Sequence, residues 1–136
     1  STTQARRLYG TIAAGGTAGA MLGPTLTVVL VERLGVANML LVSVAGCTAF
    51  DVQSILEKNR QDVTGYDVEI TGTRAETHPR KFTAFHINHI VHGRNVSEKA
   101  VADAIKLSDE IYCSVAATVR PTAEITTSYE IVDDGE

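Results

Sequence analysis

The residues best suited to chemistry in this sequence are two cysteines, Cys47 and Cys113. A thiolate can attack an electrophilic oxygen or sulfur atom, and a second nearby thiol can then close a disulfide. The pair forms neither a C-x-x-C motif nor a secreted disulfide framework, so it indicates a reducing, cytoplasmic location. Packing is the usual role of a buried free cysteine. The thiols alone therefore leave a structural and a redox interpretation open.

Three histidines close together, His86, His89 and His92, raise the question of a metal site. They lie in a stretch of alternating apolar and polar residues, so His86 and His92 should point to one face of a strand and His89 to the other. The outer two would be roughly 20 Å apart along an extended strand. We therefore expect surface or interface histidines, with no metal and no bound cofactor.

Composition excludes several other classes of protein. The chain has 136 residues, 44% of them hydrophobic and only 5% aromatic, which indicates one domain with a mainly aliphatic core. Its net charge of -4 argues against nucleic acid as a partner. No phosphate-binding loop and no nucleophile elbow is present.

The element that must position Cys47 is the apolar stretch over residues 39–60. Its first half is apolar nearly all round, which predicts a central helix buried on several sides. Cys47 and Asp51 fall on one line of this helix. Cys47 lies about two turns from the start, where the helix dipole is weak. An activating cation would have to come from elsewhere in the fold.

The remaining chain predicts an α+β fold with a mostly antiparallel sheet. Gly65 is suited to a left-handed stop after the helix. Asn95 is the expected N-cap of a second helix, with Glu98 completing a capping box and Cys113 at or just past the end. Alternation predicts strands over residues 66–71, 82–92 and 124–131, and the second helix spans about 96–112.

Residues 1–38 differ from the rest of the chain. No charged side chain occurs from Leu8 to Val31, and Gly15, Gly19 and Gly23 recur at every fourth position. This run is long enough to cross a membrane and has the spacing of a close helix contact there. A pair of β-branched strands around a Gly-rich loop fits equally well. The sequence thus predicts two parts, an atypical segment over 1–38 and a globular domain over 39–136.

Several motifs in the second part resemble the OsmC/Ohr family of osmotically inducible and organic-hydroperoxide-resistance proteins. They are the central-helix motif over 41–56, the R-A-E-T-H-P run at 74–79, and the segments 82–93, 104–115 and 123–132, which match the YhfA-like branch. The resemblance covers about residues 40–133. Residues 1–40 weakly resemble a permease segment of the major facilitator type.

The resemblance implies an intertwined, strand-swapped homodimer with active sites at the subunit interface. It further implies that Cys47 is the peroxidatic thiol and Cys113 the resolving one, with an organic hydroperoxide as substrate and a lipoyl or other thiol reductant. Where the family has Pro-x-Glu before the helix, this chain reads Val36-Ala-Asn38. Arg7 is the available substitute for the activating cation of the family.

We therefore predict thiol-dependent reduction of organic hydroperoxides in oxidative-stress defence. The alternative is a non-catalytic dimer of the same fold that binds an apolar small molecule at its interface. A membrane-tethered protein that uses residues 8–31 as a span is a third interpretation.

Overall fold

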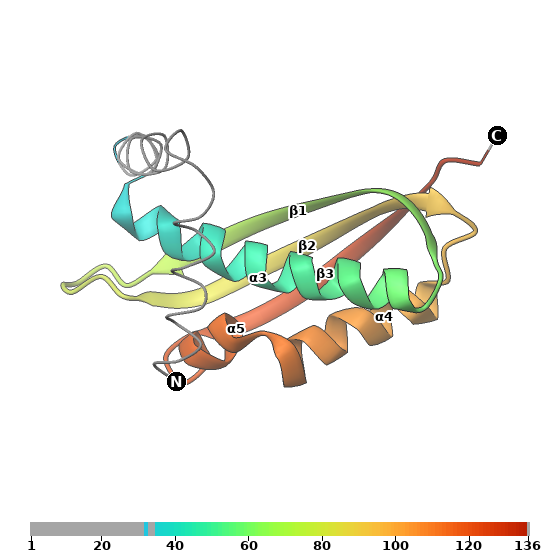
Figure 1. Ribbon diagram of the computed structural model, residues 1–136. Helices are drawn as coiled ribbons and strands as arrows, with labels where there is room; N and C mark the ends of the chain where they lie inside the picture. The colour runs from blue at the N-terminus through green and yellow to red at the C-terminus, as the bar shows by residue number, and fades with distance from the viewer. Residues whose placement is uncertain (1–31, 33–34, 136) are drawn as a thin grey trace, which may run out of the picture. The chain divides into compact units, whose positions relative to one another are not determined.

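The computed structural model describes Glu32 and residues 35–135 of the chain. Helix α3 (Val36–Lys58) precedes the hairpin of β1 (Asp62–Arg74) and β2 (Phe82–Arg94). Next come helix α4 (Glu98–Leu107), the π-helical turn η1 (Ser108–Tyr112), the short helix α5 (Ser114–Val119) and strand β3 (Glu124–Asp133). This order of helix, strand, strand, helix and strand confirms the predicted α+β class (Figure 1).

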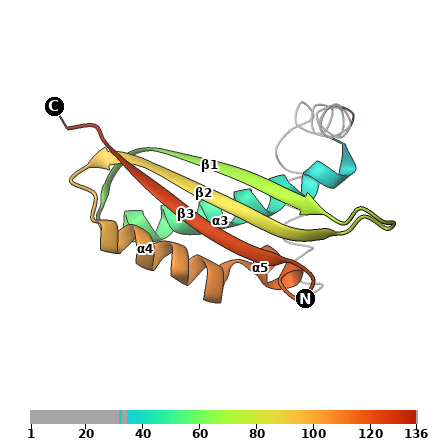
Figure 2. The same ribbon diagram turned by 180° about the vertical axis from the view of Figure 1, so that it is seen from behind.

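The three strands form one sheet in the order β1-β2-β3. Helices α3, α4 and α5 all cover the same face of this sheet, as the front and back views show (Figures 1 and 2). The other face carries no described element. The domain is thus a two-layer arrangement in which the helices and the inner face of the sheet share one core.

The pairing of β3 refines the expectation of a mostly antiparallel sheet. Strands β1 and β2 pair antiparallel, as a hairpin must, but β2 and β3 pair parallel with Phe85 opposite Ile125. Parallel neighbours need a long crossover, and the helical segment from α4 to α5 supplies it. Cys113 lies within this crossover and is therefore carried over the inner face of the sheet.

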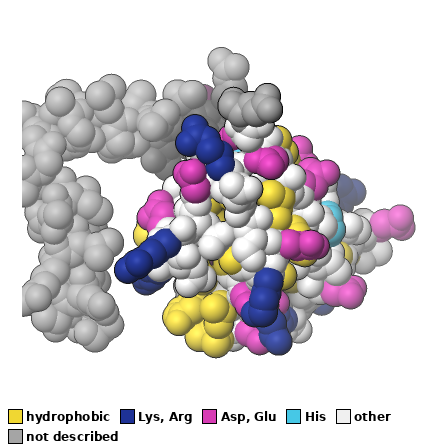
Figure 3. All heavy atoms as spheres, turned by 90° about the vertical axis from the view of Figure 1, so that its right-hand side faces the viewer, with side chains coloured by type: hydrophobic (Ala, Val, Ile, Leu, Met, Phe, Trp, Pro, Cys, Tyr) yellow, Lys and Arg dark blue, Asp and Glu magenta, His cyan; other side chains and the backbone are white. Residues whose placement is uncertain are grey.

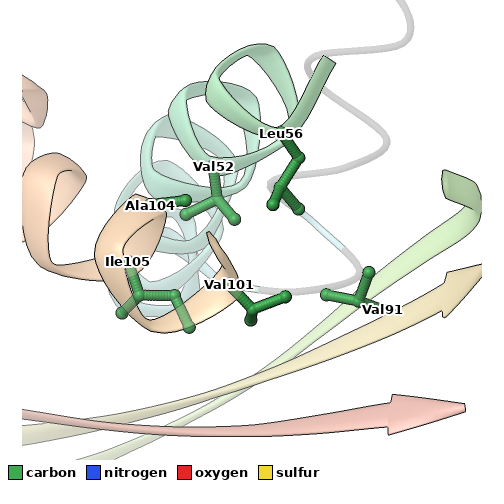
Figure 4. Packing of buried hydrophobic residues seen from close by; sticks show 6 residues of the cluster. All are labelled: Val52, Leu56, Val91, Val101, Ala104 and Ile105. Carbon is green, nitrogen blue, oxygen red and sulfur yellow. The ribbon is translucent and has the colours of Figure 1, made fainter. Parts of the chain in front are cut away.

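Two apolar clusters fill the space between the layers. In the first, Val52 and Leu56 of α3 point toward α4 and toward Val91 of β2 (Figure 4). The second joins Val44 of α3 to Phe85 and Ile87 of β2. Removing a buried Leu or Val side chain from such a cluster costs about 1–5 kcal/mol, so these contacts hold α3 in place.

The alternation along β2 places the histidines as predicted. His86 and His92 lie on the open face of the sheet, and His89 lies on the helix side with no exposed surface. His86 contacts the hydroxyls of Thr126 and Ser128, while His92 pairs with the carboxylate of Asp67. The three rings therefore do not meet.

Helix α3 is buried on one side only, which corrects the prediction of a helix buried on several sides. Its buried residues are Val44, Ala45, Thr48, Val52 and Leu56. Phe50 is 73% exposed and Val42 is 48% exposed on another side of the helix. Within the described chain nothing covers them, because the sheet and α4 both pack against the side that carries the buried residues. Helix α3 is also long and apolar enough to cross a membrane, a test that core helices of soluble proteins pass as well.

Two local predictions were wrong. The N-cap of α4 is Ser97, whose hydroxyl accepts the N–H of Ala100 at 3.3 Å, whereas Asn95 occupies a left-handed turn with φ 50°. After α3 the left-handed residue is Arg60 with φ 56°, and Gly65 already lies in β1 opposite His92. After α3 the strand begins sooner than the side-chain pattern indicated, and before α4 both the strand end and the helix start lie two residues later than predicted.

The chain divides between Met39 and Leu40 into two compact units, and both cysteines lie in the second unit. The predictions for the first 31 residues, whether strands or a membrane span, lie outside the described residues. The predicted domain boundary at residue 38 stays a prediction.

Candidate functional site

The structure brings the two predicted thiols together. The Sγ atoms of Cys47 and Cys113 and a carboxylate oxygen of Asp51 all lie within 4.8 Å of one another. Both cysteines are free. An S–S bond is about 2 Å long, so oxidation requires the two side chains to turn toward each other.

The two cysteines differ in exposure. Cys47 is half-buried on α3, whereas Cys113 is 3% exposed. A reagent from solution therefore reaches Cys47 more readily than Cys113. This difference in exposure suits a pair in which the Cys47 sulfur atom contacts the substrate and the Cys113 sulfur atom reacts afterwards.

The π-helical turn η1 sets the position of Cys113. Its widened hydrogen bond runs from the N–H of Cys113 to the carbonyl of Ser108 at 2.8 Å. Cys113 then leaves the helix with an extended backbone, and its Sγ accepts the N–H of Ala116 at 3.4 Å as the N-cap of α5. The sulfur atom is thus fixed at the junction of two helical segments.

A chain of hydroxyls links the same elements beneath the thiols. The Ser108 hydroxyl donates to a carboxylate oxygen of Asp51 at 3.2 Å. Because that donation uses its one hydrogen, Ser108 accepts from Thr48, whose Oγ1 lies 3.0 Å away. Thr48 and Ser108 are both buried, and through this chain they orient the Asp51 carboxylate.

Burial raises the pKa of the Cys113 thiol to about 11. The neighbouring Cys47 and Asp51 act in the same direction, and the N–H of Ala116 partly opposes them. Cys113 is therefore protonated at neutral pH. A protonated, buried thiol is a poor first nucleophile, because the thiolate is the reactive form.

Comparison with known proteins places this site in a family. Residues 37–128 match the family described as OsmC-like protein. The chain belongs to the OsmC-like family. It is 48% identical over 95 residues to protein YhfA of Escherichia coli strain K12, a match that covers 70% of this chain and 71% of YhfA.

Solved structures show the same OsmC-like fold. A hypothetical protein from Aquifex aeolicus VF5 is 38% identical with a TM-score of 0.69, over 72% of this chain and 74% of that one. An OsmC-like protein from Mycoplasma pneumoniae, at 16% identity, has a TM-score of 0.63 over 72% of each chain. These matches confirm the predicted family and fold.

A groove beside the thiols is the best candidate for a ligand site in this OsmC-like domain. It has a volume of about 470 Å³ and lies between α3 and the end of the α4–η1 segment. Asp51 forms part of its wall and lies within 4.8 Å of both sulfur atoms, although neither cysteine lines the groove. Its apolar lining residues are Phe50, Ile55, Leu107 and Tyr112. A groove of about 460 Å³ between α4 and β3 includes none of the three site residues.

Large apolar side chains near this groove are exposed. Phe50 is 73%, Ile111 64% and Tyr112 58% exposed. In the space-filling view, hydrophobic side chains gather at the lower margin of the face shown, while charged side chains are dispersed over the rest of it (Figure 3). A cluster of exposed aromatic and aliphatic side chains is typical of a protein or ligand interface.

Sequence reasoning assigned Cys47 and Cys113 but gave no role to Asp51, Thr48 or Ser108. The spacing of Asp51 four residues after Cys47 was the available signal, because such residues are neighbours on a helix surface. Ser108 gave no comparable signal, since its contact with Asp51 depends on how the crossover packs against α3. Arg7, the predicted activating residue, lies outside the described residues.

Proposed function

We propose that this OsmC-like protein reduces organic hydroperoxides by thiol chemistry, with Cys47 as the attacking thiol and Cys113 as the resolving thiol. The observation that supports it most directly is the placement of a half-buried and a buried sulfur atom within 4.8 Å. Family membership supports the same class of redox chemistry. Free cysteines held as a reactive pair fit a cytoplasmic location.

The first step consumes the peroxide. The Cys47 thiolate attacks one peroxide oxygen, the O–O bond breaks, and the products are a Cys47 sulfenic acid and an alcohol. Asp51, one helical turn along α3, is placed to accept the thiol proton and return it to the departing alkoxide. In this proposal Asp51 performs the role of the family glutamate, whose own position is occupied by Asn38 in the present chain.

The second step closes the disulfide. The sulfur atom of Cys113 attacks the sulfenic sulfur, an S–S bond forms, and hydroxide leaves as water with the Cys113 proton. An external dithiol, such as a lipoyl group, or another thiol then reopens the bond through a mixed disulfide. One peroxide and two reducing equivalents are used in each cycle, with no bound cofactor.

The groove favours an apolar organic peroxide over hydrogen peroxide as the substrate. Its lining of Phe50, Ile55, Leu107 and Tyr112 buries hydrocarbon surface at about 25 cal/mol per Å². We propose further that the exposed apolar side chains of α3 and η1 are covered in a homodimer. That arrangement would enclose the groove between two subunits.

Intact-mass measurement tests the proposal. One equivalent of cumene hydroperoxide should remove two hydrogen atoms from the reduced protein and block both thiols to iodoacetamide. Cys113→Ser should stop at a sulfenic acid that dimedone traps, and Cys47→Ser should lose turnover. An unchanged mass with both thiols still free would contradict the proposal.

The second candidate is a non-catalytic dimer that binds an apolar small molecule. The groove favours it, because its volume and apolar lining suit a ligand without any reaction. A fluorescent apolar probe that binds to the reduced protein, together with thiols that stay free after peroxide, would select this candidate. Probe binding that weakens in Phe50→Ala would locate the ligand in the groove.

A further inference from the structure

We propose that the reduced protein binds one thiophilic divalent cation, of the Zn²⁺ class, through Cys47, Asp51 and Cys113. The Sγ atoms of the two cysteines and one Asp51 carboxylate oxygen would be the ligands. The inference uses the residues of the proposed function but does not depend on peroxide turnover. Among residues 35–135, this is the one group of three His, Cys, Asp or Glu side chains close enough to share an ion.

The spacing of the three atoms fits a tetrahedral ion after a small adjustment. With Zn–S near 2.3 Å and Zn–O near 2.1 Å, tetrahedral ligand atoms are about 3.6–3.8 Å apart. The observed separations are no greater than 4.8 Å, so each pair has to close by about 1 Å at most. Rotation of cysteine and aspartate side chains covers that distance without moving the backbone.

The ligands come from two elements that are already held together. Cys47 and Asp51 lie four residues apart on α3, which places both on one face of the helix. Cys113 comes from the crossover, at the junction of η1 and α5. The hydroxyl of Ser108 holds Asp51 from behind, and metal-binding carboxylates are commonly oriented by such a hydrogen bond.

Charge favours a cation at this position. Once a cation has displaced the thiol protons, the two sulfur atoms and the carboxylate would present three negative charges to it within 4.8 Å. The described ion pairs involve His92, Arg94, Lys99 and Arg120, and none of them includes Asp51. A divalent cation would reduce this to one net negative charge, and the half-buried Cys47 leaves a path of entry. Three protein ligands leave the fourth position to water.

Metal binding and the disulfide exclude each other, because the disulfide uses both sulfur ligands. A hydroperoxide that oxidises the loaded site forms the S–S bond, takes up two protons, releases an alcohol and water, and expels the cation. The oxidised protein should therefore bind no metal at this site. This mutual exclusion gives the proposal a readout that does not require catalysis.

Cobalt(II) titration of the reduced full-length chain, under anaerobic conditions, tests the site. We expect one Co²⁺ per chain, a sulfur-to-cobalt charge-transfer band and the visible bands of a tetrahedral ion. Zn²⁺ should displace the cobalt, and its affinity follows from competition with a chromogenic chelator. Asp51→Asn, which keeps both thiols, should lower the Zn²⁺ affinity at least about tenfold, as should Cys47→Ser and Cys113→Ser.

Two variants on the open face of the sheet serve as matched controls, one that removes a carboxylate and one that removes an imidazole. Asp67→Asn and His86→Asn each remove a common metal-binding group away from the thiols and should leave the affinity unchanged. Circular dichroism of every variant excludes loss of folding as the cause of weaker binding.

Several outcomes would overturn the metal site. They are affinity that survives Cys47→Ser or Cys113→Ser, one cation per two chains, and equal binding by reduced and oxidised protein. A disulfide that forms with peroxide in a protein that binds no cobalt would reject the metal site and keep the peroxidase. If the protein binds cobalt but its thiols stay free after treatment with peroxide, the metal site is kept and the peroxidase is rejected.

Discussion

At the residue scale, the most constrained polar group outside the sulfur site is His89. Its Nδ1 is hydrogen-bonded to the hydroxyl of Tyr66, and its Nε2 has no partner among the described residues. Along β2 it lies between Ile87 of one apolar cluster and Val91 of the other, and it has no exposed surface. Burial lowers the pKa of His89 to about 4, from an ordinary value of 6.5.

This depressed pKa predicts acid sensitivity with a defined range. Above pH 6.5 neither the folded nor the unfolded chain protonates His89, and its contribution to stability is complete. Between pH 6.5 and 4 only the unfolded chain takes up the proton, so the free energy of unfolding falls, by up to about 3 kcal/mol. Below pH 4 both states bind it and the loss levels off. Urea unfolding at pH 7, 5.5 and 4.5 measures the effect.

The double variant Tyr66→Phe/His89→Phe isolates this contribution from that of the carboxylates. Replacing both partners with apolar rings leaves no unpaired polar group, so stability at pH 7 should change little. The fall between pH 6.5 and 4 should become shallower than in the natural chain. Parallel pH profiles for the two proteins would show that His89 does not carry the effect.

At the residue scale, the sequence predicted the two cysteines of the site but not the residues that contact them. Resemblance selected Cys47 and Cys113, and the structure brings their sulfur atoms together. Alternation correctly separated the histidines onto two faces. Asp51 and Ser108 were not assigned because their contact is 57 positions apart along the chain and depends on tertiary packing. Periodicity predicts which residues share a face of one helix or strand, whereas this contact depends on how two elements pack together.

At the element scale, α4 connects the crossover to the core. It buries Val101, Ala104 and Ile105 against α3 and β2, and Ser97 caps its first turn. The structure therefore places the N-cap two residues beyond Asn95, the residue that the sequence predicted. Asn95 has a left-handed backbone and lies in the turn before the helix.

Ser97→Ala should reduce the free energy of unfolding by about 1 kcal/mol, because the N–H of Ala100 loses its acceptor. Asn95→Gly is the matched comparison, since glycine adopts φ 50° without strain and no helix cap is removed. Its stability should stay within about 0.5 kcal/mol of the natural chain. Thermal unfolding measures the stability of both variants. A larger loss of stability in Asn95→Gly than in Ser97→Ala would indicate that Asn95 is the N-cap.

Element boundaries were predictable only where patterns were long. The central helix, the two long strands and the last strand agree in type and approximate position with the prediction. The short helix α5 was missed, since its six residues contain no complete amphipathic repeat. The widened turn η1 has no signature in side-chain type, because it is defined by backbone hydrogen bonds.

At the scale of the whole molecule, the feature to explain is an apolar surface on α3 and η1 that none of the described residues covers. Phe50, Ile111 and Tyr112 are more exposed than large apolar side chains usually are in a monomer. A second copy of the chain is the cover that the proposed dimer supplies. The sequence could not reveal this exposure, since apolar residues on all sides of a helix are equally typical of a fully buried one.

Phe50→Glu should weaken the proposed dimer at least about tenfold, because a charge would be buried in an apolar contact. The fold of the single chain should persist, since the Phe50 side chain is 73% exposed. Sedimentation velocity over a dilution series measures the change. Thr71→Glu adds the same charge on β1, where the side chain is exposed, and should leave association unaltered. Identical sedimentation of both variants would remove α3 from the interface.

The π-helical turn makes the sulfur pair sensitive to chain length as well as to residue type. A π turn holds one residue more than an α turn, so deleting a single exposed residue such as Glu110 would let α4 continue in ordinary geometry. The N–H of Cys113 would then bond the Ser108 carbonyl as in an α turn, and Cys113 would keep its place beside Cys47. One added residue has no such accommodation, because the turn is already widened, and should rotate Cys113 by about 100° around the helix axis. Deletion of Glu110 should therefore preserve thiol pairing, whereas insertion at the same place should abolish it although neither cysteine is replaced.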